Sequence, residues 1–140
     1  MGQGERLVDL KAAGARAMLV GLRLYDPDAA ATLVERYQRS NSWRLYGYPR
    51  GERLVGVIGL ELRREGNGTI RHIAVVPESR LQAIGRRMIQ LAESLHALSA
   101  VDAETDADAV GFYEACGFSI ESLGELYRGV ERFRCVRAMK

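Results

Sequence analysis

Apolar side chains recur at helical spacing through most of the first forty residues. Residues 5–10 predict a weak first strand, and the stretch AAGARAMLVGLRLY, which ends at Tyr25, predicts a first helix because it is rich in helix formers. Asp26 and Pro27 suit the N-cap and the first position of a second helix, which we expect to extend to about Ser40. The apolar positions of this second helix are Ala30, Leu33, Val34 and Tyr37.

From Trp43 to Pro77 the pattern changes to aromatic and β-branched segments separated by Gly, Pro and Asn. Such segments are typical of strands, and we expect three, at about 43–48, 54–63 and 69–76. The connecting sequences PRGE and EGNG are short enough for antiparallel hairpins. The middle of the chain is therefore predicted to form a three-stranded meander.

After Pro77 the pattern becomes helical to about Ala97, and LSAVDAE then predicts a brief strand. A short helix is expected from Asp106 or Asp108 to Gly117, because glycine suits the left-handed position that ends a helix. Its apolar face would hold Val110, Tyr113 and Cys116. Two closing strands follow, at 118–124 and 131–138, so the order of elements predicts one α+β domain over residues 1–140, a mixed sheet covered by helices.

Composition excludes several classes of protein. The 20 basic and 18 acidic residues are interleaved and give a net charge of +2, so we expect no general nucleic-acid binding. The N-terminal MGQGERLVDLK lacks an apolar signal core and no segment reaches the roughly 20 apolar residues that span a bilayer, so we expect a cytoplasmic protein that binds no membrane. Cys116 and Cys135 have no metal-ligand spacing nearby, and we expect both to be reduced and packed, with no metal site.

Candidate chemistry begins in VVPESRLQAIGRRM, residues 75–88, where a strand passes into a helix that begins near Ile84. The first turn of a helix has up to four unpaired N–H groups and roughly half a positive charge, so it favours an anion. Ala83 and Gly85 are small enough for a phosphate to approach the backbone. The loop therefore predicts a phosphate site, although the nucleotide P-loop and dinucleotide patterns are absent. Three arginines strengthen the positive field of this site: Arg80, Arg86 and Arg87.

Two segments resemble motifs of the GNAT superfamily of N-acetyltransferases. One is the loop pattern [Q/R]-x-x-[G/A]-x-[G/A] after a V-x-P strand end, matched by Val75, Pro77, Arg80, Ala83 and Gly85. The other is ETDADAVGFYEACGF, residues 104–118, which is similar to N/D-x-x-A-x-x-F-Y-x-x-x-G-F through Asp106, Ala109, Phe112, Tyr113, Gly117 and Phe118. With the strand order, the resemblance covers roughly residues 43 to 124.

The resemblance implies a mostly antiparallel sheet of six or seven strands with about four helices, splayed between the strand ending at Val76 and the strand near Val101. Acetyl-CoA, the implied cosubstrate, would lie in this wedge. Its pantetheine arm would bond to the backbone of residues 73–75 and its pyrophosphate to the amides of residues 81–86. Many members have glycine at the positions of Leu81 and Ala83, so this bulkier loop predicts weaker cofactor binding. The implied cofactor-binding residues are Ile73, Ala74, Val75, Arg80, Leu81, Gln82, Ala83, Ile84, Gly85 and Arg86.

The same resemblance implies that Tyr113 is the general acid, with its phenol directed at the cofactor sulfur. Glu104 follows a short strand and is our candidate to attract or deprotonate the amine opposite the cofactor. His72, which should share a strand face with Ile70 and Ala74, and Glu61 are weaker candidates that structural roles also explain. We expect His96 at an exposed helix end and Cys116 outside the reaction.

These inferences predict an enzyme that moves acetyl from acetyl-CoA to a primary amine of a small molecule, peptide or protein. A noncatalytic acyl-CoA-binding module of the same fold is the alternative. A nucleic-acid binder that uses the arginines at positions 80, 86 and 87 is a third possibility. A homodimer through the C-terminal strands is compatible with the sequence.

Overall fold

The computed structural model describes residues 6–10, 19, 26–77 and 83–139. The predicted first helix lies outside this part of the chain, except for Leu19, which is helical and buried. The predicted loop residues Arg80, Leu81 and Gln82 lie outside it as well.

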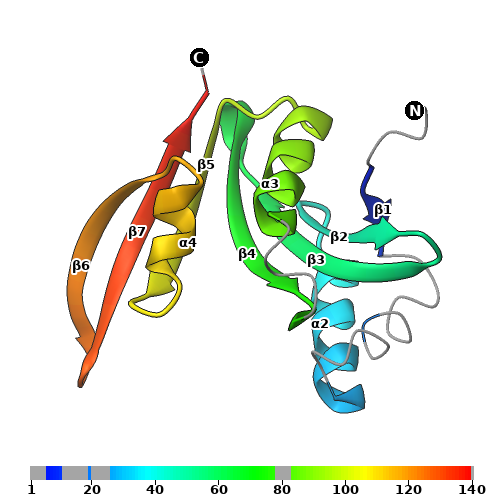
Figure 1. Ribbon diagram of the computed structural model, residues 1–140, viewed down its shortest axis with the longest axis horizontal. Coiled ribbons are helices and arrows are strands. Elements are labelled where there is room, and N and C mark those ends of the chain that lie inside the picture. Colours follow the sequence, from blue (N-terminus) through cyan, green and yellow to red (C-terminus); the bar gives the residue numbers. More distant parts are fainter. Residues whose placement is uncertain (1–5, 11–18, 20–25, 78–82, 140) are drawn as a thin grey trace.

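Seven strands form one mixed sheet in the order β1-β2-β3-β4-β5-β7-β6 (Figure 1). All neighbouring strands are antiparallel except β4 and β5, which are parallel. The predicted meander and the predicted sheet of six or seven strands are confirmed. The strands are β1 (Val8–Asp9), β2 (Trp43–Arg50), β3 (Arg53–Leu62), β4 (Asn67–Val75), β5 (Ala100–Asp106), β6 (Ser119–Tyr127) and β7 (Val130–Ala138).

Three helices lie in the described residues: α2 (Pro27–Arg39), α3 (Ile84–Leu95) and α4 (Val110–Ala115). The predicted start of α2 is confirmed, because the Asp26 side chain accepts a hydrogen bond of 2.7 Å from the backbone N–H of Ala29. None of these helices has the length and apolar character required to cross a membrane.

Helices α2 and α3 pack on opposite faces of the sheet. A Cβ at Gly59 would meet the Tyr37 hydroxyl of α2, whereas a Cβ at Gly56 would meet the Met88 side chain of α3 at 3.0 Å. Because the two glycines are three residues apart on one strand, they face opposite sides. The two faces share one apolar core, which also includes Cys135, and Cys135 is free and buried as expected.

The boundaries differ from the prediction where side chains cap the backbone. Helix α4 begins at Val110 rather than at Asp106 or Asp108, because Oδ1 of Asp106, the last residue of β5, accepts hydrogen bonds from the N–H groups of Asp108 and Ala109. The β3–β4 connection holds a short 3₁₀ turn, Arg64–Gly66, so β4 begins at Asn67.

Strand β4 carries a bulge at Arg71. Leu60 of β3 pairs with Ile70, and the preceding Gly59 pairs with His72, so Arg71 is the extra residue. His72 therefore faces α2 and Ile70 faces the other side, and the expectation that both share a face with Ala74 is wrong. The predicted exposure of His96 is also wrong, because its ring is half-buried with Nε2 2.7 Å from the Tyr46 hydroxyl oxygen.

Strands β4 and β5 pair over only three positions, Asn67 with Ala100, Gly68 with Val101 and Thr69 with Asp102. Beyond Thr69 the two strands separate (Figure 1). This is the splay that the family resemblance implied.

Candidate active site

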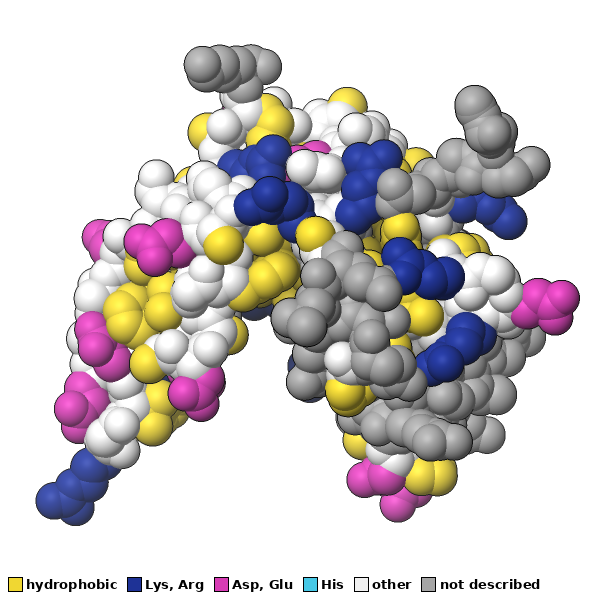
Figure 2. Space-filling model, viewed as in Figure 1, with side chains coloured by type: hydrophobic (Ala, Val, Ile, Leu, Met, Phe, Trp, Pro, Cys, Tyr) yellow, Lys and Arg dark blue, Asp and Glu magenta, His cyan; other side chains and the backbone are white. Residues whose placement is uncertain are grey.

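A cavity of about 830 Å³ opens where β4 and β5 separate. Its volume lies within the range of small-molecule sites. In Figure 2 hydrophobic side chains lie at the head of a hollow beside the left-hand lobe, and basic side chains lie above them. The lining residues come from β4, α3, β5 and α4: Arg71, His72, Ile73, Ala74, Val75, Ala83, Gly85, Arg86, Thr105, Ala109, Phe112, Tyr113, Ala115 and Cys116.

The N-terminus of α3 forms one side of this cleft. The first intrahelical hydrogen bond runs from the N–H of Arg87 to the carbonyl of Ala83, at 3.1 Å. The N–H groups of Ile84, Gly85 and Arg86 precede it and have no acceptor among the described residues. Ala83 supplies no side-chain cap. These three donors are therefore available to an anionic ligand.

Gly85 keeps this helix end close to α4. A Cβ at position 85 would lie 2.8 Å from two ring atoms of Phe112. The Arg86 guanidinium donates a hydrogen bond to the carbonyl of Ala115 at the end of α4. The two helices thus enclose the cleft by close contacts at a glycine and at an arginine.

Tyr113 of α4 lies at the inner wall of the cleft and is 5% exposed. Its ring packs edge-on against Phe112 and Phe118, with centroids 5.1 and 5.3 Å away. Burial, reinforced by the nearby thiols of Cys135 and Cys116, raises the pKa of Tyr113 to about 12. The phenol therefore stays protonated at neutral pH, and its hydroxyl has no hydrogen-bond partner within the described segments.

His72 of β4 borders the cleft and also a second pocket beside α2, toward which its ring faces. Its Nδ1 lies 2.7 Å from the hydroxyl oxygen of Tyr37 in α2, and the two rings pack edge-on. Burial lowers the pKa of His72, and the positive charges of Arg36 and Arg71 lower it further. His72 is therefore neutral at pH 7, and one ring nitrogen remains after the contact with Tyr37.

Residues 17–118 match the sequence pattern of the Acetyltransferase (GNAT) family, which is more than half of the chain. The protein belongs to the GNAT family. Among proteins with curated descriptions, none matches the sequence.

Solved GNAT structures share the fold at low sequence identity. A GNAT-family protein from Desulfovibrio desulfuricans superposes with a TM-score of 0.79 and 18% identity over 96% of this chain and 99% of its own. An aminoglycoside 6'-N-acetyltransferase complexed with coenzyme A gives 0.77 and 16% over 97% of both chains. A spermidine N-acetyltransferase chimera from Vibrio cholerae and hSSAT gives 0.70 and 19% over 96% and 94%.

The cleft gathers most of the described residues that the GNAT resemblance marked for the cofactor. Ile73, Ala74, Val75, Ala83, Gly85 and Arg86 line it, whereas Ile84 is buried beneath it. Two of the predicted arginines are held by neutral acceptors: Arg86 donates to the carbonyl of Ala115, and Arg87 donates to the side-chain oxygen of Gln90 at 3.2 Å.

The structure does not bring Glu104 into the cleft beside Tyr113. The neighbouring Thr105 lines the cleft, so Glu104 faces the opposite side of the sheet and is exposed. There it borders a second cavity of about 420 Å³, which also takes in Arg71. Because Arg71 lines both cavities, the two spaces adjoin at the splay of the GNAT sheet.

Sequence reasoning missed Thr105 and Arg71. In the sequence, Ala103 and Thr105 alternate with the acidic residues Asp102, Glu104 and Asp106, and this alternation predicts that Thr105 lies on the face opposite Glu104. The position of Arg71 between the two cavities depends on the bulge in β4, and no residue pattern predicts this bulge.

Proposed function

We propose that this GNAT protein transfers an acetyl group from acetyl-CoA to a primary amine. The supporting observation is one cleft in which the N-terminal N–H groups of α3, the edge of β4 beyond Thr69 and the protonated phenol of Tyr113 meet. An extended, amide-bearing anion fits such a cleft better than a compact ligand does.

The residues of the cleft suit acetyl-CoA in two places. The N–H groups of Ile84, Gly85 and Arg86 would bind the pyrophosphate, with the predicted loop residues Arg80, Leu81 and Gln82 beside them. Gly85 leaves room for this approach, since a side chain there would already contact Phe112. The backbone of Ile73 would pair with the pantetheine amides, because its N–H and C=O point away from β3 and β4 has no partner strand on this side beyond Thr69.

When bound, the thioester of acetyl-CoA supplies the activated acetyl group. The nitrogen of the acceptor amine bonds to the acetyl carbon, the carbon–sulfur bond breaks, and the amine loses one proton. His72 is neutral and lines the cleft, so it is positioned to accept this proton. Glu104, on the adjoining cavity, would attract the acceptor in its ammonium form.

Tyr113 would stabilise the departing thiolate. Its pKa of about 12 exceeds the ordinary thiol value of roughly 8.5, so complete proton transfer to the sulfur costs about 5 kcal/mol. A hydrogen bond from the phenol to the developing thiolate costs no such transfer. Tyr113 therefore acts chiefly as a hydrogen-bond donor while charge accumulates on sulfur.

The acceptor is an amine in this proposal because two of the related structures are enzymes named for spermidine and for aminoglycosides, both of which carry amines. Their sequence identities to this chain are 19% and 16%, so the identity of the acceptor must be inferred from the residues of this chain.

The test combines binding with turnover. Acetyl-CoA and coenzyme A should raise the thermal midpoint at micromolar to millimolar concentration, and adenosine should not. Thiol release in the presence of an amine panel should then reveal turnover. Tyr113→Phe should lower kcat roughly 10- to 100-fold with unchanged coenzyme A affinity, and Tyr127→Phe, an exposed tyrosine on β6, is the matched control.

Two results would reject parts of this proposal. Absence of any stabilisation by either coenzyme would reject the cleft as the cofactor site. Tight coenzyme binding without thiol release for any amine would instead support the noncatalytic acyl-CoA-binding module.

A further inference from the structure

A basic groove follows the β4–β5 boundary on the face opposite the α3 side of the cleft. It joins the 420 Å³ cavity beside Glu104 to a cavity of about 520 Å³ near the β3–β4 turn, because Arg63, Asp102 and Arg134 line both. We call the region the arginine groove and define it by Arg63, Arg71, Arg132, Arg134, Asp102 and Glu104.

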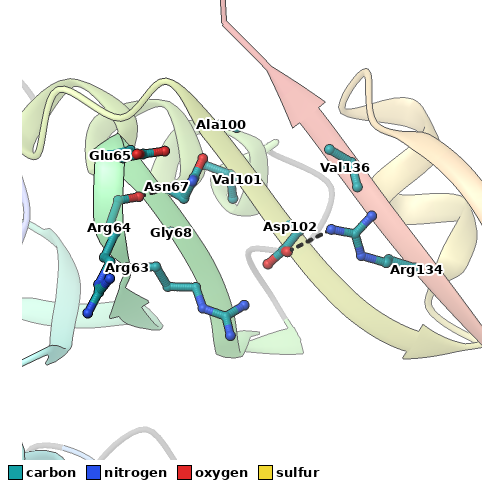
Figure 3. A pocket seen from close by; sticks show the side chains of 10 residues that line it. All are labelled: Arg63, Arg64, Glu65, Asn67, Gly68, Ala100, Val101, Asp102, Arg134 and Val136. Carbon is teal, nitrogen blue, oxygen red and sulfur yellow. Dashed lines mark hydrogen bonds and ion pairs between the residues drawn. The ribbon is translucent and has the colours of Figure 1, made fainter.

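The carboxylate of Asp102 is already neutralised within the groove. Its Oδ1 accepts a hydrogen bond of 2.6 Å from the Thr69 hydroxyl, and its Oδ2 lies 3.2 Å from Nη2 of Arg134. Arg63 donates to the same Thr69 hydroxyl at 3.3 Å. Figure 3 shows the Asp102–Arg134 pair and the Arg63 side chain, which extends into the space between β4 and β5. Arg63 therefore contributes a positive charge that Asp102 does not cancel.

Arg132 is the least compensated cation of the groove. It is half-buried on β7 and forms no ion pair within the described ranges. Its cross-strand neighbour on β5 is Asp106, but Oδ1 of Asp106 binds the N–H groups of Asp108 and Ala109, and Asp106 does not line the groove. A half-buried guanidinium without a carboxylate favours a bound anion.

Arg71 is compensated and held in place. Its guanidinium forms an ion pair with Glu61 and lies 5.5 Å from the centroid of the Trp43 ring. It borders both the cleft and the groove. Arg71 therefore lies between the cleft and the arginine groove, and its positive charge is balanced by Glu61.

Glu104 is the one acid of the groove without an ion-pair partner in the described segments. Thr69 and Asp102 are the last residues that pair across the two strands. Arg71 lies two residues beyond Thr69 on β4, and Glu104 lies two residues beyond Asp102 on β5. Arg132 lies beyond Glu104, because it pairs with Asp106, whereas Arg63 lies before Glu104 at the level of Asp102. The unpaired carboxylate of Glu104 at the splay, followed by the uncompensated guanidinium of Arg132, suits a ligand that has an ammonium group at one end and an anion at the other.

We infer that the acceptor is a primary amine that also carries a carboxylate or phosphate, with its anion bound by Arg132 and its ammonium group directed to Glu104. This inference rests on the proposed function. It opposes a polycation such as spermidine as the acceptor, because the arginines without an ion pair in the described segments, Arg63 and Arg132, outnumber the unpaired acid Glu104, so the groove would repel a second ammonium group.

The experiment compares matched amines with purified protein and acetyl-CoA. One arm pairs α-amino acids with their carboxamides, a second pairs 2-aminoethyl phosphate with ethanolamine, and a third uses spermidine. The anionic member should have the larger kcat/KM by roughly 10- to 100-fold, because charge-assisted hydrogen bonds are lost in the neutral member. The first two arms distinguish a carboxylate from a phosphate.

Variants test the groove itself. Arg132→Gln should raise KM for the anionic acceptor about 10-fold or more and leave the neutral member unchanged. Arg132→Lys provides a second measurement if Arg132→Gln lowers the thermal midpoint, because it keeps the charge but loses the forked guanidinium. Arg128→Gln, in the exposed turn between β6 and β7, is the control.

The outcomes separate the two proposals. Efficient transfer to spermidine or to the neutral amines alone would overturn the anionic acceptor and leave acetyl transfer standing. Equal kcat/KM within both matched pairs, or an Arg132→Gln effect that is the same for both members, would also overturn it. Transfer to no amine, whether or not coenzyme A binds, would overturn both.

Discussion

The hydroxyl oxygen of Tyr37 lies 2.7 Å from Nδ1 of His72, and this contact links α2 to β4 at the splay of the sheet. The contact exists because the bulge at Arg71 turns His72 toward α2. Gly59 is the third participant, since a Cβ at this position would lie 1.9 Å from the same hydroxyl. The orientation of the proposed base is thus set by a helix that lies on the other side of the sheet from the cofactor helix.

Removing His72 should change the pH dependence of the reaction. Because the pKa of His72 is lowered from 6.5, its neutral form persists below pH 6.5 and protonation removes the base only at more acidic pH. We expect His72→Gln to lower kcat/KM about 10- to 100-fold and to flatten the decline on the acidic side of the profile. Tyr37→Phe should lower kcat less and keep that decline, since it affects only the position of the ring. An unaltered profile in His72→Gln would exclude His72 as the base.

Gly85 and Gly111 form a matched pair for the contact between α3 and α4. Gly85→Ala should displace the Phe112 ring, which lies 2.8 Å from the added carbon, and raise the Kd of coenzyme A about 10-fold. Gly111→Ala meets no atom within 4 Å and should raise the free energy of unfolding by about 0.5 kcal/mol without an effect on Kd. Titration calorimetry and thermal unfolding measure both. Equal Kd values in the two variants would contradict a phosphate site at Gly85.

Two alanines with left-handed backbone flank α3, Ala83 at φ 58° and Ala97 at φ 51°. Glycine avoids the steric cost of this conformation, so Ala83→Gly and Ala97→Gly should each stabilise the fold by about 0.5 to 1 kcal/mol. Only Ala83→Gly should also tighten coenzyme A binding, because Ala83 lines the cleft and Ala97 lies at the far end of the helix. Identical changes in coenzyme affinity would place the anion elsewhere.

Glu93 of α3 should make the fold less stable as the pH rises. Its carboxylate is buried, Oε2 has no hydrogen-bond donor among the described residues, and Nε of Arg137 lies 3.4 Å from it. Burial raises the pKa of Glu93, although Arg137 opposes the shift. The folded protein therefore holds this proton more tightly than the unfolded chain, so the stability contribution is present below pH 4.5 and is lost as the pH rises through the folded pKa.

Glu93→Gln should accordingly raise the free energy of unfolding at pH 7 by up to about 1 kcal/mol and have little effect near pH 4. Denaturant unfolding at both pH values measures this difference. Glu35→Gln is the control, because the Glu35–Arg39 pair is exposed and should contribute less than about 0.5 kcal/mol. A destabilised Glu93→Gln at pH 7 would show that the ion pair with Arg137 outweighs the cost of burial.

Local pattern was sufficient for the meander and for α2, because strand alternation and the Asp26–Pro27 start depend on neighbouring residues. The cofactor cleft was predictable from a family motif rather than from periodicity. The start of α4 was not, since Asp106 bonds to the backbone beyond the strand and delays the helix.

The orientation of His72 and the arginine groove could not be read from the sequence for a different reason. His72 depends on a bulge, and the groove depends on the pairing of β4 with β5 and β7, which brings Arg63 near Arg134 from positions 71 residues apart. Such long-range placement follows from the whole sheet and leaves no local signature.

The three residue pairs between β4 and β5 have a consequence for dynamics. Main-chain hydrogen bonding across this boundary ends at Thr69. A ligand that occupies the splay would therefore connect the two sides of the sheet and restrict their relative motion. The amide hydrogen of Ile73, which points away from β3, should then exchange with deuterated solvent more slowly in the presence of coenzyme A than in its absence.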